Sequence, residues 1–159
     1  MSRKLELLVI HCTATPDGRA VSSDDIRKWH TSPKPTGRGW SRVGYSDMIH
    51  LNGWIENLRE YNHNGWVDHW EVTNGARGHN HHARHVVYVG GISNGKPADT
   101  RLQEQYDAME AYVKYTLWRY PQIKIAGHNQ LSDKACPSFD VAKFCRMIGI
   151  PERNIYNPE

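Results

Sequence analysis

The sequence predicts an α/β fold with one central mixed β-sheet flanked by helices, and three observations support this prediction. The apolar run at residues 5–10 is typical of a strand that is buried on both faces of a sheet. Residues 85–91 have the composition of a second strand. Residues 102–117 carry apolar side chains at helical spacing. Because strands alternate with helices along the chain, we expect the helices to cover the faces of the sheet.

The length and composition suit one compact domain over residues 1–159. The chain has 159 residues, of which 38% are hydrophobic and 23% are charged. The longest apolar stretch is far shorter than the roughly 18 residues that a membrane-spanning helix needs. The first residues also lack the long apolar segment of a secretory signal. We therefore expect no membrane partner and a protein that is cytoplasmic as synthesised unless it is released.

The first elements are predicted from local signals. The strand at residues 5–10 is expected to lie inside the sheet and to end at His11. Ser22 or Ser23, followed by two acidic residues, predicts the capped start of a helix that runs to about His30.

A β-hairpin and a long loop are expected next. The pair Asn52-Gly53 predicts a tight two-residue turn between strands at residues 44–51 and 54–57. Residues 58–80 show little periodicity and many aromatic, Asn and His residues, which predicts a long surface loop.

The second half of the chain alternates strands and helices. After the strand at residues 85–91, Thr100 is expected to cap a long helix. The apolar positions of that helix are Leu102, Tyr106, Met109, Val113 and Leu117. A short strand at 123–126 leads to His128, and Ser138 is expected to cap a last helix. The apolar face of the last helix comprises Val141, Phe144, Cys145 and Ile148.

Charge and cysteine content exclude several classes of protein. The 20 basic residues are dispersed among 17 acidic ones, with a formal net charge of +3, so a nucleic-acid partner is not expected. The three cysteines show no spacing typical of a disulfide framework. Cys12 points away from His11 on a strand and Cys145 lies on an apolar helix face, so both are predicted to be core residues.

One set of residues has the pattern of a catalytic metal site. The sequence contains 10 histidines, and imidazole is the commonest metal ligand. The spacing of His128 and Cys136 allows one loop to bring an imidazole and a thiolate to one point, where His11 can join them. Three such ligands leave the fourth position of Zn2+ open, as in catalytic zinc sites. A lone strand-end histidine is more often a hydrogen-bonded core residue, but the coincidence of three positions favours a ligand.

Two further groups of residues are open to more than one interpretation. The histidine-rich tract at 79–82 is either a second metal site or a surface or substrate-facing loop, and the second hypothesis is preferred because the residues of the tract alternate faces if extended. Trp54, Trp66 and Trp70 either stack on sugars or anchor the long loop, and these hypotheses stand equal.

Several segments around these positions together resemble a known family. They are VIHCTAT (9–15), IRKWH (26–30), GRGWSRVGY (37–45), GHN (78–80) and HNQLSDKACPSFD (128–140). In this order, and over roughly residues 5–149, they resemble the zinc amidases of the phage-lysozyme type. The peptidoglycan recognition proteins belong to the same superfamily. After GHN the family commonly has Ser-Ile-Gly, whereas this chain has a different tract that includes Arg84 and His85.

The resemblance implies an activity and a set of residues that perform it. The implied enzyme is a zinc-dependent N-acetylmuramoyl-L-alanine amidase that lyses or remodels bacterial cell walls, for example as a phage or prophage endolysin. Its Zn2+ ligands would be His11, His128 and Cys136. Tyr45 would be the active-site tyrosine, which orients the attacking water or shares its proton, and Lys134 would be the catalytic lysine, which stabilises the oxyanion.

The implied partner is peptidoglycan, reached after release from the cytoplasm, and we expect a monomer. The alternative function is a peptidoglycan-binding module without catalysis. Non-catalytic members of the superfamily typically lack the cysteine ligand, which this chain has as Cys136.

Overall fold

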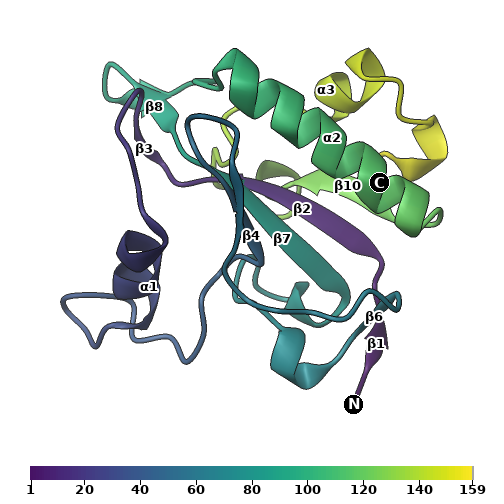
Figure 1. The fold of residues 1–159 in the computed structure, drawn as a ribbon, viewed down its shortest axis with the longest axis horizontal. Coiled ribbons are helices and arrows are strands. Elements are labelled where there is room, and N and C mark those ends of the chain that lie inside the picture. The colour runs from purple at the N-terminus through teal and green to yellow at the C-terminus, as the bar shows by residue number, and fades with distance from the viewer. Residues whose placement is uncertain (159) are drawn as a thin grey trace.

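A computed structural model, which describes residues 1–158, shows a central five-stranded sheet with the strand order β10-β2-β7-β4-β5 (Figure 1). The strands are β10 (Lys124–Gly127), β2 (Leu7–Cys12), β7 (Ala83–Tyr88), β4 (Asp47–Ile49) and β5 (Ile55–Asn57). The first four are parallel to one another, and β5 is antiparallel to β4. The sheet is therefore mixed, and β2 is an interior strand, as predicted.

Two small sheets and four short 3-10 helices complete the strand and loop structure. One small sheet pairs β1 (Arg3–Lys4) with β6 (Trp66–Val67), and the other contains β3 (Thr15–Pro16), β8 (Gly91–Ser93) and β9 (Lys96–Pro97). The 3-10 helices are η1 (His69–Glu71), η2 (Asn80–His82), η3 (His128–Gln130) and η4 (Glu152–Asn154).

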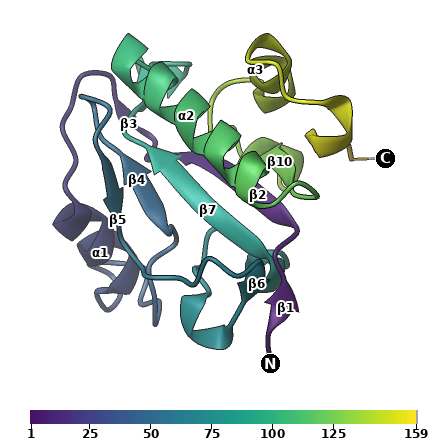
Figure 2. The same cartoon turned by 45° about the vertical axis from the view of Figure 1, so that its right-hand side comes forward.

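Three α-helices flank the sheet, and they are α1 (Ser23–Thr31), α2 (Gln103–Arg119) and α3 (Val141–Met147). Figures 1 and 2 show α2 and α3 on one side of the sheet and α1 on the other. Ser22, one of the two predicted caps, is the N-cap of α1, and its side chain accepts a hydrogen bond from Asp25 N in a reciprocal capping box. No helix of residues 1–158 is long and apolar enough to span a bilayer.

Side-chain alternation divides the sheet into two faces. On β2 and β7, Leu8, Ile10, Val86 and Tyr88 belong to the main core under α2 and α3. That core also contains Cys12 of β2 and the predicted apolar face of the last helix, which includes Cys145, so both cysteines are core residues as predicted. The alternate residues face the other way, where Val87 packs in a cluster with Ile26 of α1, and Leu7, Val9 and Ala83 form a separate small cluster.

Some element boundaries differ from the predictions. The first strand begins at Leu7 and continues to Cys12, so His11 lies within it. Leu5 and Glu6 are excluded because their N–H groups bond outside the sheet, to the carbonyl oxygens of Gly65 and His82.

The two predicted caps in the second half were wrong. The hydroxyl of Thr100 accepts from Gly91 N at 2.8 Å, so Leu102 becomes the N-cap of α2. Ser138 has a positive φ of 70°, and Asp140 caps α3 instead by accepting from Lys143 N at 3.0 Å. At both helix starts the predicted residue has another contact or backbone conformation, and a residue two positions further along is the N-cap.

The predicted hairpin is present, but its turn differs from the prediction. Ile49 pairs with Ile55, so the connection is longer than the predicted two-residue turn. Gly53 has a positive φ of 85°, and the side chain of Asn52 accepts from Trp54 N at 3.0 Å. These residues therefore shape a wider loop.

The segment at residues 58–80, predicted to be a long surface loop, contains β6 and η1 and is pinned to the core. The buried carboxylate of Glu71 accepts from the backbone N atoms of Asn62 and Asp68, both at 2.6 Å. Tyr61 donates to the buried carboxylate of Asp47 on β4 at 2.6 Å. Buried acceptors of this kind fix the backbone of a loop.

Candidate active site

The three predicted ligands meet at the carboxyl ends of β2 and β10. Each of His11, His128 and Cys136 offers one ligand atom, and these atoms all lie within 4.8 Å of one another. Gly127 pairs in register with Ile10, so the next residues on the two parallel strands are His128 and His11, whose ring centroids lie 4.7 Å apart. Parallel pairing thus brings His11 and His128, which are more than one hundred residues apart in the sequence, into contact.

The loop that carries Cys136 is held by hydrogen bonds from the sheet. Cys12 N donates to the sulfur of Cys136 at 3.2 Å, and the buried hydroxyl of Tyr88 donates to Pro137 O at 2.8 Å. Both donors come from interior strands. Two interior strands of the sheet therefore fix the position of the sulfur.

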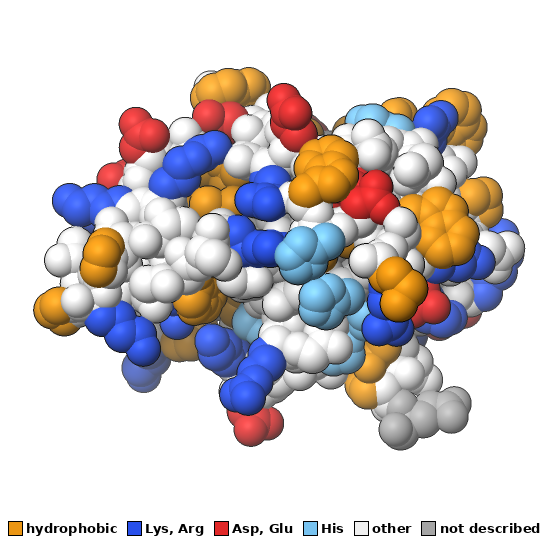
Figure 3. All heavy atoms as spheres, turned by 90° about the horizontal axis from the view of Figure 1, so that it is seen from below, with side chains coloured by type: hydrophobic (Ala, Val, Ile, Leu, Met, Phe, Trp, Pro, Cys, Tyr) orange, Lys and Arg blue, Asp and Glu red, His pale blue; other side chains and the backbone are white. Residues whose placement is uncertain are grey.

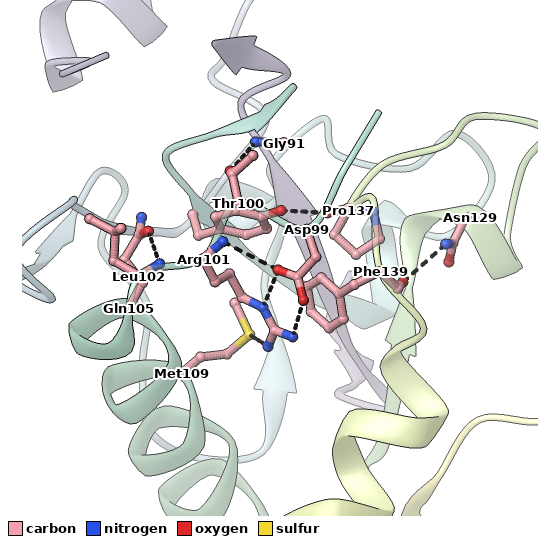
Figure 4. A network of polar contacts seen from close by, with 11 residues as sticks. Gly91, Asp99, Thr100, Arg101, Leu102, Gln105, Met109, Asn129, Pro137 and Phe139 are labelled. Carbon is pink, nitrogen blue, oxygen red and sulfur yellow. Dashed lines mark hydrogen bonds and ion pairs between the residues drawn. The ribbon is translucent and has the colours of Figure 1, made fainter. Parts of the chain in front are cut away.

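A second set of contacts holds the same loop from its outer side (Figure 4). The guanidinium of Arg101 lies 3.5 Å from the ring centroid of Phe139 and pairs with Asp99 at 2.9 Å. Asn129, next to a ligand, donates to Phe139 O at 3.3 Å. The segment just before α2 thus packs against the cysteine loop.

Burial favours neutral imidazoles at this site. Burial and the neighbouring His85 hold the pKa of His11 well below its usual range, and burial and Lys134 lower the pKa of His128. The Cys12 thiol and burial raise the pKa of the Cys136 thiol. The site therefore offers two lone-pair donors at once, and its thiolate forms when a cation shares the site.

Tyr45, the predicted active-site tyrosine, lies beside the ligand cluster. Its ring centroid is 5.1 Å from that of His11 and 5.2 Å from that of His30. His30 Nδ1 accepts from Gly44 N at 3.0 Å and so fixes the backbone next to the tyrosine. Burial raises the pKa of Tyr45, which keeps its phenol protonated at neutral pH and able to donate a hydrogen bond.

Lys134, the predicted catalytic lysine, lines a cavity beside the ligands. This cavity has a volume of 530 Å³, and His128, Trp40, Arg77 and Asn80 also line it. Figure 3 shows histidine side chains gathered on one face of the molecule with Lys and Arg side chains beside them. An exposed ammonium at the edge of such a cavity can approach a bound anion.

The structure bears on both open hypotheses. Among residues 1–158, the only group of three or more His, Cys, Asp or Glu side chains that could hold a metal is the one at His11. His82, in the histidine-rich tract, instead contacts Glu6 at 3.0 Å. Trp54, Trp66 and Trp70 are 57%, 49% and 47% exposed, which leaves part of each side chain accessible to a sugar.

Sequence reasoning missed residues that support the ligands. His85 is fully buried on β7, and its Nδ1 lies 2.9 Å from Nε2 of His11. His30 was predicted only as the end of the first helix and as part of the segment IRKWH, with no role at the site. The available signal was a polar residue at the start of an apolar strand, but its partner depends on strand register, which the sequence does not give.

Comparison with known proteins gives the family. The family described as N-acetylmuramoyl-L-alanine amidase matches residues 1–139. The chain belongs to this amidase family. It is 30% identical over 140 residues to an endolysin of Enterobacteria phage T3, across 87% of this chain and 84% of the phage protein.

Solved structures support the amidase fold. N-acetylmuramoyl-L-alanine amidase LysC from Clostridium intestinale matches with a TM-score of 0.70 and 20% identity, over 93% of this chain and 87% of that chain. A complex of the peptidoglycan recognition proteins LCa and LCx with bound tracheal cytotoxin matches with a TM-score of 0.64 and 17% identity, over 90% of this chain and 81% of that chain. The predicted family and fold are thus confirmed, and in this amidase the His-His-Cys group fits a metal site.

Proposed function

We propose that this amidase uses one zinc ion, held by His11, His128 and Cys136, to cleave the bond between N-acetylmuramic acid and L-alanine in peptidoglycan. The observation that carries the proposal is the convergence of three ligand atoms within 4.8 Å. Two imidazoles and one thiolate suit zinc, whereas magnesium and calcium prefer oxygen ligands. Three protein ligands leave one position open for chemistry.

The reaction needs a nucleophile and a way to stabilise charge. When bound, zinc supplies a Lewis acid that polarises the amide carbonyl and makes water nucleophilic at neutral pH. Tyr45, with its phenol kept protonated, donates a hydrogen bond that orients the attacking water. Lys134 stabilises the negative charge that develops on the carbonyl oxygen.

Peptidoglycan is the substrate that fits the cavity and the relatives. The cavity beside the ligands is lined by two cationic side chains, Arg77 and Lys134, which suit a polymer whose stem peptides carry carboxylates. Tracheal cytotoxin, a muropeptide, is bound in the similar recognition-protein structure. These observations support binding of a stem peptide next to the metal.

The similarity to a phage endolysin supports a cytoplasmic protein that reaches the wall after release. Fractionation of producing cells tests this part of the proposal. The protein should stay with the cytosolic fraction until the cells are opened.

Digestion of purified sacculi tests the activity itself. Zinc-loaded protein should release stem peptides, chelated protein should not, and added zinc should restore release. Pelleting with the same sacculi reports binding separately. If the protein pellets with sacculi but releases no peptide under any metal condition, a binding module without catalysis replaces the proposed enzyme.

A further inference from the structure

We propose that His85 is a positioning residue that fixes His11 in the tautomer whose Nδ1 faces the metal. The inference rests on the proposed zinc function and goes beyond its ligand set. It is carried by a chain of hydrogen bonds that runs from the part-buried Asn80 through the buried His85 to the buried His11.

The chain of hydrogen bonds begins at Oδ1 of Asn80, which is identified as an acceptor by its two donors. Oδ1 of Asn80 accepts hydrogen bonds from the backbone N atoms of Gly75 and Ala76, at 3.0 and 2.9 Å. An amide NH2 group in that place would face two donors, so the oxygen must occupy it. The side chain of Asn80 therefore presents an acceptor to its remaining neighbour.

That neighbour is His85, and its tautomer follows. Nε2 of His85 lies 3.0 Å from Oδ1 of Asn80 and must carry the proton, because a lone pair there would face an acceptor. The other ring nitrogen of neutral His85 is then an acceptor.

The tautomer of His11 follows in the same way. Nε2 of His11 lies 2.9 Å from Nδ1 of His85 and must be the donor. Its lone pair is therefore on Nδ1, which lies 3.7 Å from the sulfur of Cys136. The hydrogen-bond chain thus aims the one basic nitrogen of His11 at the other ligands.

The position of His85 is built into the fold. Val9 pairs with His85 and Val87 with His11, so both histidines point to the same face of the sheet, two residues apart along it. A Cβ atom at Gly75 would come within 2.5 Å of Cγ and Nδ1 of the His85 ring. The absence of a side chain at Gly75 therefore lets the loop pack directly on this imidazole.

A neutral partner has an electrostatic consequence. A carboxylate in place of His85 would orient His11 equally well but would add a negative charge near the thiolate of Cys136. Such a charge would offset part of the positive charge of zinc and reduce its ability to polarise a carbonyl. A neutral imidazole orients the ligand without that cost.

Two substitutions at one position separate the acceptor from the packing. His85→Phe keeps a flat ring of similar size but removes the acceptor. His85→Asn removes most of the ring but places Oδ1 near the position of Nδ1, where it can accept from His11. Removal of an outer hydrogen-bond partner typically weakens metal binding by about 10- to 100-fold.

The measurement is zinc affinity, determined by chelator competition starting from the zinc-loaded proteins. We expect His85→Phe to bind zinc about 10- to 100-fold more weakly than wild type, and His85→Asn to recover most of that loss. Equal affinity of wild type and folded His85→Phe overturns the inference, as does equal weakening by both substitutions. Failure of the wild type to bind zinc would instead overturn the proposed function.

A second measurement needs no variant. Long-range 15N–1H correlation spectra of zinc-loaded wild type report which nitrogen of each histidine carries a proton. We expect the His11 proton on Nε2 and the His85 proton also on Nε2. A His11 proton on Nδ1, with zinc bound through Nε2, contradicts the inference even if His85→Phe does not fold.

Discussion

On β2, the side chains of Leu8, Ile10 and Cys12 pack under α2 and α3, whereas that of His11 joins the ligand cluster on the opposite face. The face under α2 and α3, which we call the helix-covered face, is apolar and contains the main core. The other face has smaller apolar clusters interrupted by buried histidines. One strand therefore belongs both to the main core and to the site.

The difference shows how the site gains its precision. The polar residues of the active face are held by hydrogen bonds, such as the one between His11 and His85, and each depends on a specific partner. The helix-covered face is held by apolar contacts, which tolerate changes that preserve volume. Changes at the ligand cluster should therefore affect zinc and rate, and changes in the core under α2 and α3 should affect stability alone.

The largest effect is expected from Cys136→Ser on the active face. A hydroxyl is a much poorer zinc ligand than a thiolate. Loss of a direct ligand should weaken zinc binding by more than the roughly 100-fold that an outer partner can cost, and release of stem peptide should fall to the chelated background. Elemental analysis after dialysis measures the zinc. An unchanged zinc content in the folded variant would show that the cluster is not the metal site.

The next largest effect is expected from Lys134→Ala. An ammonium that acts mainly in the transition state should slow turnover by on the order of 10² to 10³ when it is removed. Zinc content and pelleting with sacculi should barely change. Rates on sacculi provide the test.

A matched control lies on the helix that covers the opposite face. Lys114, on α2, pairs with Glu110 at 2.7 Å, and Lys114→Ala should leave the rate unchanged. If Lys134→Ala hydrolyses at the wild-type rate with zinc retained, its role in stabilising the oxyanion is wrong.

Stability should depend on pH through His30, which lies beside Tyr45. Burial and the nearby Arg38 lower its pKa from 6.5 to about 4 in the folded protein. Between these pH values the unfolded chain takes up a proton that the folded protein does not. The stabilising contribution is therefore complete above pH 6.5 and is lost as the pH falls toward 4. At about 1.4 kcal/mol for each pKa unit, it is on the order of 3 kcal/mol.

His30→Asn isolates this contribution, because Asn keeps an acceptor for Gly44 N and does not titrate. Urea unfolding of both zinc-loaded proteins measures the free energy of unfolding, and the part linked to zinc cancels in the difference between them. We expect a shallower loss of stability from pH 6.5 to 4 in the variant. Identical pH dependence in both proteins would contradict the assignment.

The smallest effect is expected from Cys145→Ala on the helix-covered face. Cys145 is fully buried in α3, and loss of its sulfur should lower the free energy of unfolding by about 1 kcal/mol. Zinc content and specific activity should remain at wild-type values. Loss of zinc from this variant would mean that the wrong cysteine was assigned to the metal.

Local patterns were sufficient to predict much of the fold. The interior strand at β2, the capped start of α1 and the buried face of α3 all follow from residues close in sequence. The ends of elements were less predictable, because a neighbouring segment decided them. Thr100 satisfies Gly91 N instead of capping α2, a contact that no pattern in the sequence reveals.

The site divides in the same way. The positions proposed as ligands were chosen from spacing and from the family resemblance, and the structure brings them together. His85 could not be found from spacing, because its contact with His11 depends on the register in which β2 and β7 pair. The contact of His85 with Asn80 depends in turn on the loop that folds back over β7. Side chains that support ligands across strands therefore require the structure.

The most direct test of the central claim is mass spectrometry of muropeptides released from sacculi by zinc-loaded and by chelated protein. The account predicts free stem peptides that begin with L-alanine, intact glycan strands that retain N-acetylmuramic acid, and no products after chelation. Products cut within the glycan or within the stem peptide, or the same products from fully chelated protein, would contradict it.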